Sequence, residues 1–140
     1  MKAEEVIIDA VIEASRKLPF DAVKALEKAY EEEEGNSKVV LKAILDNLSI
    51  SKSLEIPLCQ DTGMMWCWAE IGRNARVDIV KLEKLIETSL AKAFKKGLFR
   101  TSVVRDAMGE RSNTGDNLPP VINYSLTSGS DITLHFLLKG

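Results

Sequence analysis

Three side chains that can bind a metal ion or move a proton follow one another at Cys59, Gln60 and Asp61. Pro57 comes just before them and Gly63 just after, so we expect the group to lie in a turn. A thiol, an amide and a carboxylate in succession could ligate a metal, attack an electrophile or take part in acid–base catalysis. Residues 56–63 are therefore the candidate functional segment.

Cys59 has three possible roles, as a metal ligand, a nucleophile or a small buried residue. A nucleophilic cysteine needs a base, and the one histidine, His135, lies in a predicted strand, where a structural role is more common. A self-contained zinc site needs about four ligands, and the sequence has no C-x-x-C pair. If Cys59 binds a metal, the other ligands must come from elsewhere.

A second polar segment, residues 100–117, is expected to lie beside the first. Its three arginines are Arg100, Arg105 and Arg111. They could bind carboxylates, because guanidinium presents a planar fork that matches two oxygens. Alternatively, they could be surface residues. Loops of this length are usually functional or disordered. On local pattern alone, Asp61 is an acid–base group or a turn residue, with the turn favoured, and residues 113–117 also form a turn.

Hydrophobic periodicity predicts the elements that position these two segments. We expect two helices at residues 3–17 and 22–34, and a third that begins at residue 36 or 37 and ends just before Pro57. A strand at 64–71 and a long helix at 77–96 follow, and the strands 121–126 and 132–138 are expected to form a hairpin. The predicted fold class is α+β, with an N-terminal helical layer, one long central helix, short strands and a C-terminal β-hairpin. Trp66, Cys67 and Trp68 are expected in the core.

Apolar residues at helical spacing give each predicted helix an inward face. These faces include Val6 and Ala10 in the first helix, Val39 and Val40 in the third and Val80 in the long one. Polar residues near the helix starts are candidate N-caps; they are Asp21 for the second helix and Asn36 or Ser37 for the third.

Length and composition limit the class of protein. A chain of 140 residues with 45% hydrophobic and 29% charged residues predicts one domain, residues 1–140, with a real core. The formal net charge of −2 gives no electrostatic reason for binding nucleic acid or an anionic membrane. No apolar run reaches the roughly 20 residues that span a bilayer, and the start of the sequence does not read as a signal peptide. We therefore expect a cytoplasmic protein.

Three ordered motifs resemble the iron–sulfur-dependent fumarate hydratase and tartrate dehydratase family, the class I fumarases. Residues 56–63, IPLCQDTG, are similar to that family's I-P-[IL]-C-Q-D-T-G segment. Residues 98–102, LFRTS, fall where the family has L-R-x-S, with Phe99 intervening. Residues 113–120, NTGDNLPP, resemble N-T-G-D-N-x-P-A, with Pro120 in place of alanine. The resemblance covers essentially the whole chain and corresponds to the N-terminal part of the α subunit.

The resemblance implies a hydro-lyase that adds water to, or removes it from, a C4 dicarboxylate such as fumarate, malate or tartrate. It implies that Cys59 is one of three thiolates that hold a [4Fe–4S] cluster, whose open iron acts as a Lewis acid. Gln60 and Asp61 would lie beside the substrate, with Asp61 in a catalytic role. Arg100 would hold a substrate carboxylate. Arg105, Arg111 and Cys67 receive no role from the motifs.

The family's other two cluster cysteines and its glycine-rich substrate loop have no counterpart in these 140 residues. We therefore expect a fragment that does not retain the cluster by itself and is inactive alone. A β subunit or C-terminal domain would complete the site, in a homo- or hetero-oligomer. The alternative is a non-catalytic protein-interaction module that kept the fold. Retention of Cys59, Gln60, Asp61 and Arg100 favours the enzyme.

Overall fold

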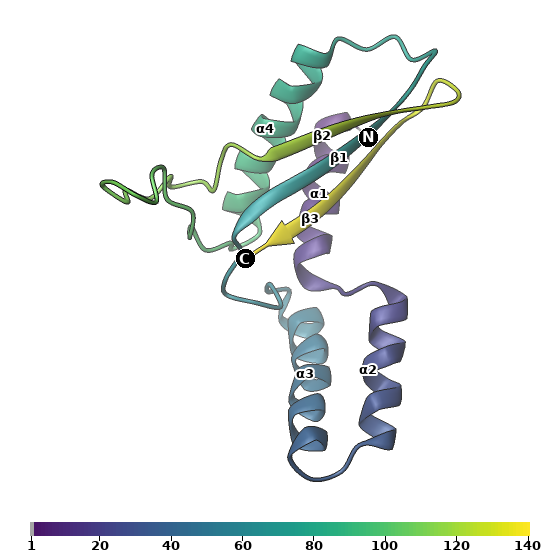
Figure 1. Cartoon of the computed structure of the whole chain (residues 1–140), viewed down its shortest axis with the longest axis vertical. Coiled ribbons are helices and arrows are strands. Elements are labelled where there is room, and N and C mark those ends of the chain that lie inside the picture. The colour runs from purple at the N-terminus through teal and green to yellow at the C-terminus, as the bar shows by residue number, and fades with distance from the viewer. Residues whose placement is uncertain (1) are drawn as a thin grey trace.

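The computed structural model describes residues 2–140 and has the expected α+β class (Figure 1). The elements within this range are α1 (Ala3–Arg16), α2 (Phe20–Glu32), α3 (Gly35–Leu54), β1 (Met64–Gly72), α4 (Ile79–Lys96), β2 (Val121–Thr127) and β3 (Ile132–Lys139). The strand after the cysteine segment and the long helix are confirmed to within two residues. Helices α2 and α3 begin earlier than predicted, so Asp21, Asn36 and Ser37 lie inside the first turns and do not cap them.

The three strands form one sheet in the order β2-β1-β3. Strand β1 pairs in parallel with β2 and antiparallel with β3, so that Trp66 lies between Val121 and Leu137. The predicted C-terminal hairpin is therefore wrong, because β2 and β3 run in opposite directions but have β1 between them. A short connection favours a hairpin only when no third strand can enter between its arms.

The connection between β2 and β3 passes over the end of β1. Its backbone hydrogen bonds to the end of β1 and to the turn that follows run from the Gly72 N–H to the Asp131 carbonyl, at 2.8 Å, and from the Asn74 N–H to the Gly129 carbonyl, at 2.9 Å. A Cβ added to Gly72 would lie 2.5 Å from the Gly129 oxygen. Only glycine allows this crossing without a shift of the backbone.

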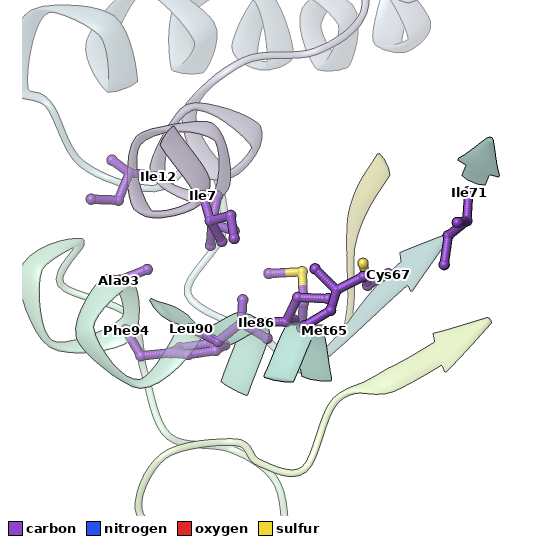
Figure 2. Close-up of a cluster of buried hydrophobic side chains, with 11 residues drawn as sticks. Ile7, Ile12, Met65, Cys67, Ile71, Ile86, Leu90, Ala93 and Phe94 are labelled. Carbon is purple, nitrogen blue, oxygen red and sulfur yellow. The ribbon is translucent and has the colours of Figure 1, made fainter. Parts of the chain in front are cut away.

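Helices α1 and α4 cover one face of the sheet and enclose the hydrophobic core (Figure 2). Side chains of β1 that alternate along the strand point into it, as the twofold period of a strand requires. The buried members are Ile7, Val11, Ile12, Met65, Cys67, Ile71, Leu82, Ile86, Leu90, Ala93 and Phe94. Cys67 is thus a core residue, as predicted.

No helix within residues 2–140 covers the other face of the sheet (Figure 1). Trp68 is 38% exposed, and the His135 imidazole opposite it lies 3.5 Å from the Glu70 carboxylate, measured from Nε2 to Oε2. Trp66 is partly buried on the same face. The expectation that both tryptophans lie in the core is wrong, because side chains alternate along β1 and Cys67 takes the inward position.

The inward faces of the helices also differ from prediction. Helix α1 buries Ile7, Val11 and Ile12 and leaves Val6 and Ala10 exposed. In α4, Val80 is 74% exposed. Several apolar residues fit more than one stripe at helical spacing, and packing against the sheet selects one of them.

Helices α2 and α3 lie side by side and extend away from the sheet (Figure 1). The predicted N-terminal helical layer is therefore divided, because α1 packs on α4 and the sheet. In helix α3, Leu41, Leu45 and Leu48 are partly buried, whereas Val39 and Val40 are exposed. Among residues 2–140, no helix is long and apolar enough to cross a membrane.

Candidate functional site

The segment that leads to Cys59 is tied to two helices. The Asn47 side-chain amide of α3 donates a hydrogen bond to the Leu58 carbonyl at 2.8 Å. The Leu58 N–H donates to the Ser15 carbonyl of α1 at 2.9 Å. The buried Ser51 hydroxyl of α3 donates to the Ile56 carbonyl at 2.6 Å. The turn therefore starts from a fixed backbone even though the side chains of Cys59, Gln60 and Asp61 are exposed.

Cys59 is a free, exposed thiol. The backbone N–H of Asp61 points at its sulfur, at 3.4 Å from N to Sγ. Sulfur is a weak hydrogen-bond acceptor, so this contact orients the thiol within its turn. A small cavity of about 160 Å³ opens beside it, lined by Ser15, Cys59, Asp61, Thr62, Phe99 and Leu138 among others.

The structure places the second polar segment against this turn. The Arg100 N–H donates to the Thr62 hydroxyl oxygen at 3.2 Å, and the Gly63 N–H donates to the Ser102 hydroxyl oxygen at 3.1 Å. Thr62 is 4% exposed, so this contact is largely shielded from water. Arg100 thus lies next to the turn that carries Gln60 and Asp61.

The functional groups of this site are free to meet a ligand. Gln60, Asp61 and Arg100 are exposed. Across residues 2–140, neither the Asp61 carboxylate nor the Arg100 guanidinium takes part in an ion pair or a side-chain hydrogen bond. A guanidinium can bind a carboxylate of a ligand, and a carboxylate can accept hydrogen bonds from a ligand's hydroxyl groups.

Asn117 is a buried residue that sequence reasoning treated only as part of a turn. Its side chain is fully buried, and its Oδ1 accepts hydrogen bonds from the N–H groups of Ser102 and Val103 at 2.8 and 3.0 Å. Its Nδ2 donates to the Arg100 carbonyl at 2.9 Å. The one signal in the sequence was its place within the motif at residues 113–120.

Two other arginines of the loop lie away from this contact. The Arg111 guanidinium donates to the Ala107 carbonyl at 3.3 Å, and the Arg105 N–H donates to the Ser112 carbonyl at 2.9 Å. Both contacts close the loop on itself. The structure therefore brings Arg100, and neither of these two, against the cysteine turn.

Residues 2–140 contain no group of three His, Cys, Asp or Glu side chains that could hold a metal ion. Cys67 is in the core, where burial raises the pKa of its thiol from 9.0 to about 11 and keeps it neutral at physiological pH. The residues present therefore suit one thiolate of a cluster and not a complete set of ligands.

The sequence profile of the fumarate hydratase (Fumerase) family matches residues 4–140. The chain belongs to this family. A relative from Methanocaldococcus jannaschii named "Putative L(+)-tartrate dehydratase subunit alpha" is 37% identical over 135 residues, which cover 94% of this chain and 47% of the relative. "Putative fumarate hydratase class I" from Geobacillus stearothermophilus is 28% identical over 99% of this chain and 27% of that protein.

The "L(+)-tartrate dehydratase subunit alpha" of Escherichia coli K12 is 22% identical over 99% of this chain and 46% of its own length. The chain spans about half the length, or less, of these fumarate hydratase family relatives. The resemblance drawn from the three motifs is thus confirmed at the level of the family.

Proposed function

We propose that this chain is part of a hydro-lyase that reversibly adds water to, or removes it from, a C4 dicarboxylate, either fumarate/malate or tartrate. Membership of the fumarate hydratase family and the names of the relatives support the reaction class. The observation that carries the proposal is the contact between the Arg100 backbone and Thr62, which joins a free guanidinium to the turn of Cys59, Gln60 and Asp61.

Cys59 would supply one thiolate to a [4Fe–4S] cluster, with the other two from outside these residues. When bound, such a cluster would supply a Lewis acid for the substrate hydroxyl. The exposed sulfur and the Asp61 N–H directed at it suit this role. The name "subunit alpha" of two relatives suggests a further subunit, so we propose that a β subunit or C-terminal domain completes the site.

The remaining residues have roles that follow from their chemistry. The Arg100 guanidinium would bind a substrate carboxylate through two parallel hydrogen bonds and would stabilise the negative charge that grows as a carbon–hydrogen bond breaks. The Gln60 amide would hold a second polar group of the substrate. The Asp61 carboxylate would exchange a proton with the substrate as an acid–base group.

The test is to produce the chain anaerobically with the polypeptides that carry the rest of the family's sequence. The complex would be assayed with fumarate, malate and both tartrates. Cys59→Ser should lose iron and activity, whereas Cys67→Ala, which changes the other cysteine, should keep both. A complex that contains iron but leaves all four diacids unchanged would rule out the enzyme and favour a non-catalytic interaction module.

A further inference from the structure

We propose that Asn117 is a positioning residue of the active site, which sets the Arg100 backbone against the Cys59 turn through its buried amide. This inference rests on the proposed function for its kinetic consequence. Its structural part concerns only how two segments of this chain are held together. Asn117 belongs to the motif at residues 113–120, whose side chains have no role in the proposed chemistry.

The Asn117 amide uses both ends to hold one backbone segment. Its Oδ1 accepts from two successive N–H groups, those of Ser102 and Val103, and its Nδ2 donates to the carbonyl of Arg100. These three bonds, between 2.8 and 3.0 Å, bracket the backbone on both sides of Thr101. A fully buried amide with both ends bonded gives a unique arrangement, because each lost bond would leave a buried polar group unpaired.

The bracketed segment is the one that contacts the cysteine turn. The Arg100 N–H donates to the Thr62 hydroxyl, and the Ser102 hydroxyl accepts from the Gly63 N–H. Thr62 and Gly63 immediately follow Asp61 in the chain. The Asn117 amide, the Arg100 segment and the Cys59 turn therefore form a continuous set of hydrogen bonds.

The position calls for asparagine on two grounds. Asn117 has a φ of 56°, in the left-handed region, where asparagine is enriched among residues other than glycine. Aspartate would keep the acceptor but lose the N–H donated to Arg100, and leucine has neither. The Asn117 N–H is itself held at 2.8 Å by the Thr114 hydroxyl oxygen, so the backbone that carries the amide is also fixed.

The alternative is that Asn117 only stabilises the fold. The position of the hydrophobic core distinguishes this role from positioning of the active site. The buried hydrophobic cluster has no member between Gly97 and Val121, although Phe99 and Leu118 pack against it. Loss of the amide should therefore loosen the loop without unfolding the core. A displacement of about 1 Å at a substrate-binding group can cost on the order of 100-fold in rate.

The first arm of the experiment measures amide hydrogen exchange in the chain, for the wild type and for Asn117→Ala and Asn117→Asp. In Asn117→Ala, exchange should accelerate at Ser102 and Val103, which lose a direct partner, whereas Asn117→Asp keeps that acceptor and loses only the bond to the Arg100 carbonyl. In both variants exchange should also accelerate at the N–H groups of Gly63 and Arg100, which donate to Ser102 and Thr62 and not to Asn117. The Asn74 amide, bonded to Gly129 at the far end of the sheet, is the control and should not change. Unchanged exchange at Gly63 and Arg100 would overturn the inference whatever the assays give.

The second arm measures kinetics in the assembled, iron-loaded complex. Asn117→Ala should lower kcat/KM on the order of 100-fold with unchanged iron content. Added to Arg100→Lys, it should cause little further loss, because both changes act through the same guanidinium. Ser89→Ala, which removes a buried hydroxyl bonded to the Leu85 carbonyl in α4, is the matched control and should keep wild-type kinetics.

If the loss of kcat/KM in the double variant equals the product of the losses in Asn117→Ala and Arg100→Lys, Asn117 acts independently of Arg100. That result would overturn the inference. The same would follow if Ser89→Ala lost as much activity as Asn117→Ala. A wild-type complex without hydro-lyase activity would refute the proposed function alone, because the exchange arm still decides whether Asn117 couples the two segments.

Discussion

Gly63 lies directly against the backbone of Lys139, so that a Cβ added to Gly63 would overlap the Lys139 carbonyl oxygen. Its φ is +62°, in the region that favours glycine. The contact lies where β1 begins and β3 ends. The cysteine turn is thus joined to the sheet at a point that has no room for a side chain.

Gly63→Ala should therefore reduce the free energy of unfolding by at least about 3 kcal/mol, through the strain of a left-handed alanine and the shift of the Lys139 backbone. Gly115→Ala is the matched control, because Gly115 has a φ of +80° but nothing within 4 Å of an added Cβ. It should cost only about 1–2 kcal/mol. Urea denaturation measures both, and equal losses would show that the contact with Lys139 is unimportant.

Arg100→Lys should lower kcat/KM in the assembled enzyme by about 10- to 100-fold, because a planar fork that makes two charged hydrogen bonds is replaced by a single ammonium group. Steady-state kinetics with each diacid measure the effect. Arg105→Lys makes the same change at an exposed arginine of the same loop and should leave the kinetics unchanged. Wild-type values for Arg100→Lys would refute the carboxylate clamp.

The buried Cys67 thiol should make stability depend on pH above neutrality. Its pKa is about 11 in the folded chain, raised by burial from 9.0, so the unfolded chain loses the proton first. The stabilisation is complete below pH 9 and is lost as the pH rises toward 11, amounting to about 2–3 kcal/mol. Chemical denaturation of wild type and Cys67→Ala across this range isolates the effect, because other groups titrate in both. Parallel stability curves would contradict it.

The core and the exposed face of α4 should respond differently to truncation. Leu90 is fully buried, so Leu90→Ala should cost about 2–5 kcal/mol. Val80 lies on the same helix but is 74% exposed, and Val80→Ala should change stability by less than about 0.5 kcal/mol. Thermal and urea unfolding would test this. A large loss at Val80 would mean that another surface covers it.

The α+β class, the strand after the cysteine turn and the long helix could be predicted from sequence, because each depends on a local period. The position of β1 in the middle of the sheet could not be predicted from sequence. Its parallel pairing with β2 joins Trp66 to Val121, a contact between segments far apart in the chain that no local pattern records. The loop at residues 127–131 has the length of a hairpin loop, and it instead passes over Gly72 and Asn74.

The adjacency of the two polar segments was expected, and the contact of Arg100 with Thr62 gives it a structural basis. The means by which they are held could not be inferred. In sequence, Asn117 is one more polar residue in a turn, and only its burial and its three bonds distinguish it. The roles of Cys59, Gln60, Asp61 and Arg100 in chemistry stay predictions.

The strand order has a consequence for how the chain folds. Strand β1 is the first strand to be synthesised, yet it lies between two strands that come after α4 and the long loop. Its hydrogen-bonding edges have no partners until nearly all of the 140 residues have been made. Contacts between distant segments slow folding, so the sheet should be the last part of the molecule to assemble, after the local α2–α3 pair. During that interval the strand that begins next to the Cys59 turn is exposed to other chains.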